Sequence, residues 1–325
     1  MIRNQWYVVL ESKELGKKPV GVKRLGERLV FWRNEEGKLS CFKDQCIHRG
    51  ASLSLGLVKG PHLQCPFHGL EFDSSGDCKL IPANGKNSAV DERFHMMRYP
   101  VFEKYGWIWI FWGNAAQIKG DPAYFPDLDE HFPYTSRQDP WEIHYSRCVE
   151  NQLDVSHLPF VHKNTIGRGN ATLVDGPLTK WISEDMFYVY VYNRHDSGTP
   201  VLKPSEVKEK PEGSQKLEFI FPNLWQNYLT PGMRIVAAFV PVDEVSSIVY
   251  LRFHQRMINI PGIREIFHAL FMPFNMRILH EDRRVVHTQE PRKTSLVMDE
   301  NLFQADQPII EYRKRRDELL KQTQD

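Results

Sequence analysis

The chain has 325 residues, of which 41% are hydrophobic and 26% are charged. This is ordinary usage for a globular protein and enough chain for about two domains, so a disordered or fibrous protein is excluded. The formal net charge is +1. There is no basic excess with which to capture nucleic acid or an anionic lipid surface, and neither partner is expected.

The N-terminus and the cysteines indicate the compartment. The first residues, MIRNQWYVVL, lack the charged leader, long apolar core and small-residue cleavage site of a secretory signal. The apolar run Trp107 to Trp112 is far shorter than the roughly 18 residues of a membrane helix. An odd number of cysteines in a chain without an export signal argues against a disulfide framework. We therefore expect a cytoplasmic protein with no membrane span, in which clustered cysteines bind metal.

In the first third of the chain, short β-branched and aromatic runs alternate with turn signals. The stretch RLVFWRNEEGKLSCF predicts two strands joined at residues 35–37, and GLEFDSSGDCKLI predicts another pair turning at Ser75 and Gly76. Residues 105–113, YGWIWIFWG, predict a closing strand buried on both faces. We expect an antiparallel β domain over residues 1–117.

Residues 113–140 are rich in Gly, Pro, Asp and aromatic residues without a sustained period, and are the candidate domain boundary. Beyond them the sequence predicts a helix near 147–158, strands near 178–194 and 215–257, a helix near 261–281 and a charged C-terminal helix. This pattern predicts an α+β domain over residues 118–325.

The first motif is a Cys-x-His, Cys46 to His48, followed after sixteen residues by a Cys-x-x-His, Cys65 to His68. A structural zinc is one alternative, but zinc fingers usually take two cysteines from one short loop, and a lone zinc does not need this mixed order. A binuclear cluster with two thiolates on one iron and two imidazoles on the other does use it. The pattern therefore indicates a Rieske [2Fe-2S] centre ligated by these four residues.

The surroundings of the motif resemble the Rieske family. Gly50 and Gly69 follow the two ligand loops as turn residues, and Leu80-Ile81-Pro82-Ala83 resembles the proline-bearing third loop that shields the cluster. Imidazole ligands raise the reduction potential, which suits a centre that accepts electrons and passes them on. The other three cysteines are expected to be small buried hydrophobes: Cys41, Cys78 and Cys148.

The second motif lies within ENQLDVSHLPFVHKNTIG. His157 and His162 are five residues apart, which on an ideal helix places them about 140° apart. Pro159 should break the helix and let His162 swing back, and Asp154 should share a helical face with His157. Two histidines and a carboxylate form the facial triad of non-haem Fe(II) oxygenases, which leaves positions open for dioxygen.

Asn151, Asp154, His157 and His162 together resemble the mononuclear-iron motif of Rieske non-haem iron oxygenase α subunits. The likeness is to the branch that includes vanillate O-demethylase and dicamba monooxygenase. In this family the carboxylate ligand lies far downstream, and the resemblance places it at Asp282. The alternatives are Glu281 as the ligand and a solvated charge cluster with no metal role.

The resemblance also implies a route for electrons. Asp154 is then a bridge rather than a ligand, and joins His157 to His68 of a neighbouring subunit, with Asn151 in the same motif. Because the family couples centres of adjacent chains, a homotrimer is implied. The sequence has no G-x-G-x-x-G fingerprint, so electrons from NAD(P)H are expected through a separate flavin and iron-sulfur reductase, directly or by way of a ferredoxin.

The resemblance implies a Rieske β domain followed by a helix-grip (START-like) catalytic domain with an antiparallel sheet. Its activity would be monooxygenation, by hydroxylation or oxidative demethylation, of a small aromatic or methylated substrate with O2, as in aromatic compound catabolism. A ring-hydroxylating dioxygenase is the alternative within the family. A non-catalytic Rieske electron carrier is the alternative from another class.

Two further features are expected to carry no chemistry. Trp107, Trp109 and Trp112 are interpreted as core or subunit-interface residues. The basic run Arg313 to Arg316 is flanked by acidic residues and is interpreted as a solvated helix face. The apolar stretch 260–279 either lines the substrate cavity or packs in the core.

Overall fold

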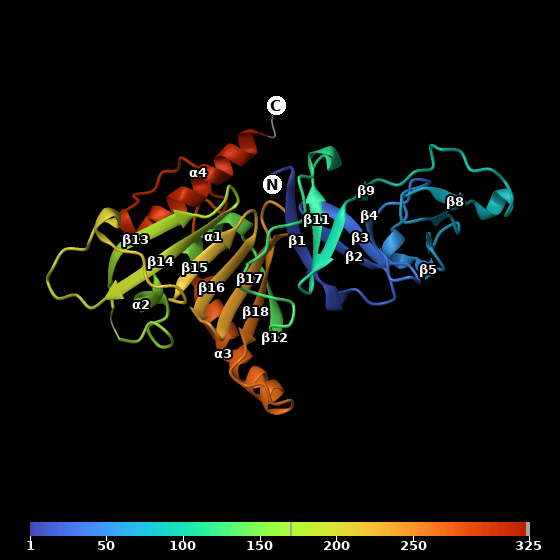
Figure 1. The fold of residues 1–325 in the computed structure, drawn as a ribbon. Helices are drawn as coiled ribbons and strands as arrows, with labels where there is room; N and C mark the ends of the chain where they lie inside the picture. The colour runs from blue at the N-terminus through green and yellow to red at the C-terminus, as the bar shows by residue number, and fades with distance from the viewer. Residues whose placement is uncertain (170, 323–325) are drawn as a thin grey trace. The chain divides into compact units, whose positions relative to one another are not determined.

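The computed structural model describes residues 1–169 and 171–322 and divides the chain into two compact units (Figure 1). One unit is Arg3–Pro122, and the other comprises Met1–Ile2 and Ala123–Asp325. The division falls close to the predicted boundary after residue 117. Residue 170 and residues 323–325 of the predicted 118–325 domain lie outside the described residues. The assignment of a function to each range stays a prediction.

The first unit is built from short antiparallel strands. Within its described residues they form a three-stranded sheet, β1-β11-β10, and two four-stranded sheets, β2-β3-β4-β9 and β5-β6-β7-β8. The strands are β1 Gln5–Glu11, β2 Val20–Arg24, β3 Glu27–Arg33, β4 Leu39–Lys43, β5 Leu57–Lys59, β6 His62–Gln64, β7 Glu71–Phe72, β8 Cys78–Leu80, β9 Arg98–Tyr99, β10 Val101–Lys104 and β11 Trp107–Trp112. The predicted hairpins β3–β4 and β7–β8 are both present.

Strand β11 is the last strand of the first unit, as the prediction of a closing strand expected. All six of its residues are buried, as the apolar run indicated. It pairs with β1 on one side and with β10 on the other. A central strand has both edges hydrogen-bonded and both faces covered, which explains why the run is apolar without alternation.

The second unit contains a seven-stranded antiparallel sheet in the order β12-β18-β17-β16-β15-β14-β13. The strands are β12 Tyr134–Trp141, β13 Leu173–Trp181, β14 Met186–Arg194, β15 Lys216–Ile220, β16 Leu224–Thr230, β17 Met233–Pro241 and β18 Ser247–Gln255; the α-helices are α1 Tyr145–Leu153, α2 Leu158–Val161, α3 Ile263–Val286 and α4 Gln307–Lys321. Strand β12 falls inside the predicted irregular boundary. Its Pro140 is tolerated because β12 is at the edge of the sheet.

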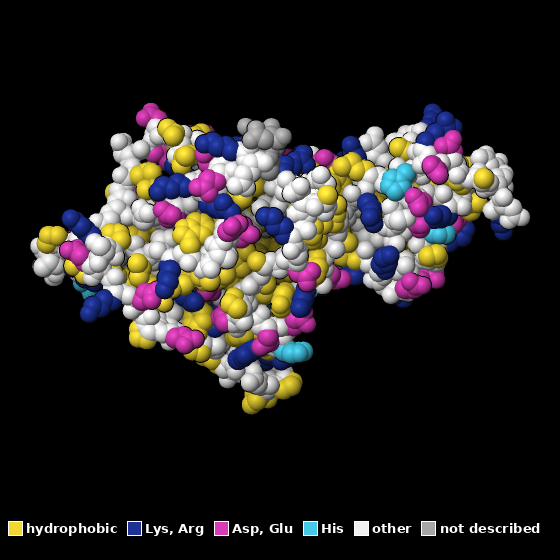
Figure 2. Space-filling model, turned by 45° about the horizontal axis from the view of Figure 1, so that its top comes forward, with side chains coloured by type: hydrophobic (Ala, Val, Ile, Leu, Met, Phe, Trp, Pro, Cys, Tyr) yellow, Lys and Arg dark blue, Asp and Glu magenta, His cyan; other side chains and the backbone are white. Residues whose placement is uncertain are grey.

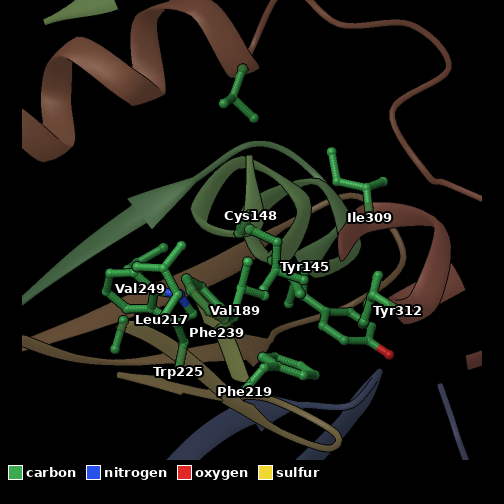
Figure 3. Close-up of a cluster of buried hydrophobic side chains, with 14 of the residues drawn as sticks. Tyr145, Cys148, Val189, Leu217, Phe219, Trp225, Phe239, Val249, Ile309 and Tyr312 are labelled. Atoms are coloured by element: carbon green, nitrogen blue, oxygen red, sulfur yellow. The ribbon is translucent and has the colours of Figure 1, made fainter. Parts of the chain in front are cut away.

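The main core lies between this sheet and helices α1 and α4 (Figure 3). Alternate strand residues such as Val189, Phe219 and Phe239 point toward Tyr145 and Cys148 of α1. From α4, the ring of Tyr312 stands edge-on to Phe219, with ring centroids 5.4 Å apart. The period of two along the strands thus buries one face of the sheet under helices, which confirms the predicted α+β architecture.

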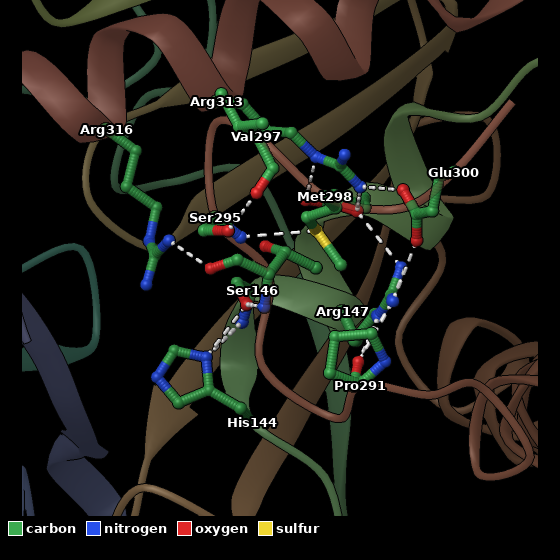
Figure 4. A network of polar contacts seen from close by, with 12 residues as sticks. His144, Ser146, Arg147, Pro291, Ser295, Val297, Met298, Glu300, Arg313 and Arg316 are labelled. Carbon is green, nitrogen blue, oxygen red and sulfur yellow. Dashed lines mark hydrogen bonds and ion pairs between the residues drawn. The ribbon is translucent and has the colours of Figure 1, made fainter. Parts of the chain in front are cut away.

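A polar network joins α1 to α4 and corrects one prediction (Figure 4). Arg313 is buried, and its guanidinium donates to both carboxylate oxygens of Glu150 at 2.9 and 2.7 Å and to Glu300 at 2.8 Å. Arg316 is also buried and donates to the carbonyl of Thr294 at 2.7 Å. The expectation of a solvated basic face was therefore wrong for these two arginines, whose partners lie too far away in sequence to be foreseen.

On the surface, acidic and basic side chains are interspersed over the visible face of each unit (Figure 2). No extended single-sign area is visible there, as expected for a formal net charge of +1. Among the helices of residues 1–169 and 171–322, each is too short or too polar to cross a bilayer.

Candidate functional site

Two loops of the first unit share one backbone design. In the first loop, the backbone amide of Cys46 donates to the carbonyl of Ala51 at 2.8 Å. The amide of Gly50 donates to the carbonyl of Cys46 at 2.9 Å. In the second loop, the backbone amide of Cys65 donates to the carbonyl of Leu70 at 2.8 Å, and the amide of Gly69 donates to the carbonyl of Cys65 at 3.1 Å. Each loop therefore closes on itself through the backbone of its cysteine.

Gly50 and Gly69 make these turns possible. Their φ angles are 76° and 72°, a region that side chains of L-residues enter only at a cost. Gly69 is also crowded, since a Cβ there would lie 3.1 Å from Cγ of Pro82. Residues 80–83 thus lie against the second loop, where the third loop of a Rieske domain was predicted.

The four predicted cluster ligands form two pairs, of which the histidine pair is exposed and the cysteine pair is buried. The rings of His48 and His68 are 4.6 Å apart between centroids, and both residues are exposed. Cys46 and Cys65 are each 2% exposed and belong to one buried cluster. Burial raises the pKa of Cys46 to about 12, so a thiolate there needs a bound cation. An inner thiol pair and an outer imidazole pair fit a [2Fe-2S] cluster whose two irons have different ligands.

The second candidate site begins where α1 ends. Asp154 is the C-cap residue of α1, and His157 and His162 bracket the short helix α2. Helix α1 therefore ends at Leu153, before Pro159, and Asp154 and His157 do not share a helical face, which corrects the expected place of the break and the expected shared face. Pro159 stands in the first turn of α2, where a proline is tolerated because that amide needs no helical partner.

The carboxylate that completes the site comes from α3. Asp282 belongs to the buried stripe of α3 with Leu279 and Val286, and its Oδ1 lies 3.3 Å from Nε2 of His157 and 3.0 Å from Nε2 of His162. The three ligand atoms all lie within 4.8 Å of one another. Two ligand atoms that are each about 2.1 Å from an ion, with a right angle between the two bonds, are about 3 Å apart. The distances from Oδ1 of Asp282 to the two imidazole nitrogens therefore suit a facial triad.

Oδ1 of Asp282 is buried, and among the described residues nothing meets it with hydrogen-bond geometry. Such an atom calls for a partner that the protein does not supply. Burial raises the pKa of Asp282, but the two imidazoles outweigh it and lower the value to about 2. Burial lowers the pKa of His157, yet Asp154 and Asp282 raise it to about 9. The carboxylates therefore favour a positive charge at this point of the site.

Side chains around the triad orient its ligands. Oε2 of Glu281 lies 2.9 Å from Nδ1 of His162 and accepts the hydroxyl hydrogen of Thr165 at 2.6 Å. Glu281 thus lies on the far side of the His162 ring from Asp282 and directs Nε2 toward the triad, as carboxylates beside metal-binding histidines do. Glu281 was the alternative ligand in the sequence, and its geometry suits this supporting position better.

Asp154 lies beside His157 but contacts it loosely. Its Oδ2 is 3.7 Å from Nδ1 of His157, too long for a hydrogen bond. Its Oδ1 accepts from the amide and the hydroxyl of Ser156 at 2.7 and 2.8 Å. Burial raises the pKa of Asp154, while His157 and Ser156 outweigh this and lower it. Asp154 is therefore an anchored carboxylate, 27% exposed.

Three other residues, Asn151, Gln152 and Thr165, belong to the surroundings of the triad. Asn151 lies on α1, and its Nδ2 is buried without a hydrogen-bond partner among the described residues. Gln152, which no sequence motif had singled out, donates from Nε2 to Oδ2 of Asp282 at 3.2 Å. Thr165 was missed as well. Both missed contacts join segments far apart in the chain, so no local spacing signalled them.

This combination of a β domain with two Cys/His loops and an α+β domain with a two-histidine, one-carboxylate site defines a Rieske-type iron oxygenase. Residues 5–101 match the model of the Rieske [2Fe-2S] domain, and residues 141–322 match that of the vanillate O-demethylase oxygenase C-terminal domain. The second match covers more than half of the chain. The chain belongs to the vanillate O-demethylase oxygenase family, which confirms the resemblance seen in the sequence.

Characterised relatives agree with this family. Methylxanthine N1-demethylase NdmA of Pseudomonas putida is 29% identical over 332 residues, which cover 98% of this chain and 89% of the relative. The oxygenase component of dicamba O-demethylase from Stenotrophomonas maltophilia is 35% identical over 166 residues. That alignment covers 50% of this chain and 48% of the relative, so the chain spans about half the length of this relative.

A solved structure extends the likeness to the whole fold. The structure of Pseudomonas putida CBB5 NdmA with caffeine superposes with a TM-score of 0.79 at 26% identity. It covers 99% of this chain and 92% of that one. The fold of this chain is therefore similar to that of NdmA over almost the whole length of the chain.

Proposed function

We propose that this chain is the terminal oxygenase component of a Rieske monooxygenase system. The observation that carries the proposal is the convergence of His157 and His162, at the two ends of α2, and Asp282, on α3, at one point. A Rieske electron carrier has no use for such a site. Two imidazoles and one carboxylate are the ligand set of non-haem Fe(II) oxygenases.

Each centre has its own ligands in this proposal. Cys46 and Cys65 bind one iron of the [2Fe-2S] cluster and His48 and His68 bind the other. The triad binds the mononuclear iron, which, when bound, supplies open coordination positions and redox chemistry for the use of dioxygen. The protein holds the ligands in place through Glu281 and Thr165, and its buried stripe on α3 keeps bulk water from Asp282.

Electrons are proposed to pass between subunits. Asp154 accepts hydrogen bonds at Oδ1, which leaves Oδ2 free to face His157 and a histidine of a neighbouring chain. We assign Asp154 as the bridge from His68 of that chain, with Asn151 beside it on α1. This assignment requires a ring of subunits, for which a homotrimer is the smallest arrangement implied by the family. A separate NAD(P)H-dependent flavin and iron-sulfur reductase, with or without a ferredoxin, supplies the electrons.

The substrate is proposed to be a small aromatic or N- or O-methylated compound. Two relatives are named as demethylases, one of methylxanthine and one of dicamba. For an O-methyl substrate, R–O–CH3, O2, two electrons and two protons give R–OH, formaldehyde and water. Hydroxylation of an unmethylated position instead retains every carbon. The cytoplasmic location expected from the sequence stays a prediction.

The test is turnover with an added reductase. Aromatic ethers, methylated amines and plain aromatics are supplied to the iron-loaded protein, while oxygen uptake and formaldehyde are followed. We expect substrate-dependent oxygen uptake with formaldehyde from a methylated substrate, and no turnover in His157→Ala. His131→Ala, at an exposed position, is the matched control. Two oxygen atoms in one product would indicate a dioxygenase, and equal activity in both variants would reject the mononuclear site.

A further inference from the structure

Gln152 makes a direct contact with the carboxylate of the proposed iron site. It stands in the last turn of α1, and its Nε2 donates to Oδ2 of Asp282 at 3.2 Å. The side chain of Asp282 is only 4% exposed. Water therefore has little access to Oδ2, and the amide of Gln152 is the hydrogen-bond donor that the described residues supply to it.

The two oxygens of Asp282 are thereby divided between two partners. Oδ1 faces Nε2 of His157 and Nε2 of His162, at 3.3 and 3.0 Å. Oδ2 is held on the other side by Gln152. A carboxylate whose second oxygen is occupied by a donor turns one oxygen, and not both, toward a cation.

The chemical type of the donor matters as well. An amide satisfies a lone pair of Oδ2 without a positive charge, whereas Lys or Arg at this place would form an ion pair with Asp282 and weaken its attraction for a metal. Gln152 is neutral at every working pH. It can therefore orient the carboxylate and leave its full negative charge for the cation.

We propose that Gln152 is a positioning residue that holds Asp282 as a one-oxygen ligand of the mononuclear iron. A second oxygen on the metal would occupy a coordination position that dioxygen or substrate needs. Gln152 keeps that position open and preorients Asp282 before the metal binds. The inference rests on the proposed function, since it concerns the same iron site.

The experiment compares Gln152→Leu with wild type, both with an intact Rieske cluster. Gln307→Leu is the matched control, because Gln307 also donates an amide hydrogen to a carboxylate, that of Glu311 at 3.0 Å on α4. Fe(II) is titrated into protein freed of its mononuclear iron, and the dissociation constant is measured. Infrared difference spectra of Fe(II)-loaded minus Fe(II)-free protein then give the separation of the two carboxylate stretching bands, which is wider for one-oxygen than for two-oxygen ligation.

We expect Gln152→Leu to weaken Fe(II) binding by about 10- to 100-fold and to narrow the band separation, while Gln307→Leu changes neither. Gln152→Glu replaces the leucine variant if that variant does not fold. Its carboxylate cannot donate a hydrogen bond to Oδ2 of Asp282, so it should also narrow the separation of the two carboxylate stretching bands. If the wild type binds Fe(II) and Gln152→Leu keeps either the wild-type affinity or the wild-type band separation, the assignment of Gln152 is overturned and the proposed function is not. Failure of the wild type to bind any Fe(II) beyond the cluster would overturn the proposed function together with it.

Discussion

Nε2 of His162 lies 3.0 Å from Oδ1 of Asp282, although one residue ends helix α2 and the other stands in the buried stripe of α3. Among the described residues, the ion-pair partners of the Asp282 carboxylate are His157 and His162, and not a lysine or arginine. Instead, Glu281 holds the opposite nitrogen of His162 and Gln152 holds the opposite oxygen of Asp282. The site is therefore arranged around a cation that the chain does not itself provide.

The first prediction concerns the backbone of the Rieske loops. Gly69→Ala should destabilise the protein more than Gly37→Ala. Both glycines have positive φ, 72° and 83°, which costs an alanine roughly 1–2 kcal/mol. The methyl group at residue 69 also meets Pro82 at 3.1 Å, whereas residue 37 has open space. Denaturant unfolding and the loss of the visible cluster absorption measure the effect, and equal behaviour of the two variants would contradict it.

The second prediction concerns the ion pairs between α1 and α4. Arg313→Met should lower the free energy of unfolding by about 3–5 kcal/mol, because it removes both short hydrogen bonds to the buried carboxylate of Glu150 and leaves the longer contact with Arg147 at 3.5 Å. Lys314→Met is the control next in sequence. Lys314 is exposed and only pairs with Glu311 at 3.4 Å, so its loss should cost less than about 1 kcal/mol. Urea unfolding of both variants measures the two losses of stability. Similar midpoints would show that the buried network does not stabilise the fold.

The third prediction concerns stability in acid. Burial lowers the pKa of His254 from 6.5 to about 3, and Arg252 adds to the effect. Between these values the unfolded chain binds a proton that the folded chain does not, so stability falls as pH decreases below about 6.5 and is unaffected above it. His254→Gln keeps a donor for the carbonyl of Phe132 and removes the titration. Its unfolding free energy should depend less on pH between 6 and 4, by up to about 1.4 kcal/mol per pH unit; an identical slope in wild type would refute the assignment.

The fourth prediction separates the two roles of Asp154. Asp154→Asn keeps Oδ1, which anchors Ser156, but removes the negative charge. The cluster spectrum and Fe(II) content should be preserved, while transfer of electrons to the mononuclear site slows by roughly 100-fold. Reoxidation of the reduced cluster in a single turnover measures this step. Undiminished product formation in that experiment would eliminate Asp154 as the bridge.

Much of the molecule followed from the sequence because its signals are local. The hairpin turns, the apolar run of β11 and the C-terminal helix depend on neighbouring residues. The Cys-x-His and Cys-x-x-His loops also carry their predicted ligands within a few positions. These features could be predicted from spacing and turn residues alone.

The parts that could not be predicted depend on partners distant in sequence. Burial of Arg313 requires Glu150, and the place of Gln152 is defined by Asp282 on another helix. The break between α1 and α2 is set at Asp154 by its own side chain, which caps the following amides, so the expected single helix was interrupted earlier than Pro159. Strand β12 lacks a clear alternation because it is an edge strand that contains Pro140.

The most direct measurement of the central claim is the iron content of wild type and His162→Gln, paired with the visible spectrum of the cluster. The variant replaces an imidazole by a neutral side chain of similar reach, and Glu281 retains Thr165 as a partner. We predict one iron fewer per chain in the variant, an unchanged Rieske spectrum and no substrate-dependent oxygen uptake. Equal iron content with full activity in the variant would contradict the account.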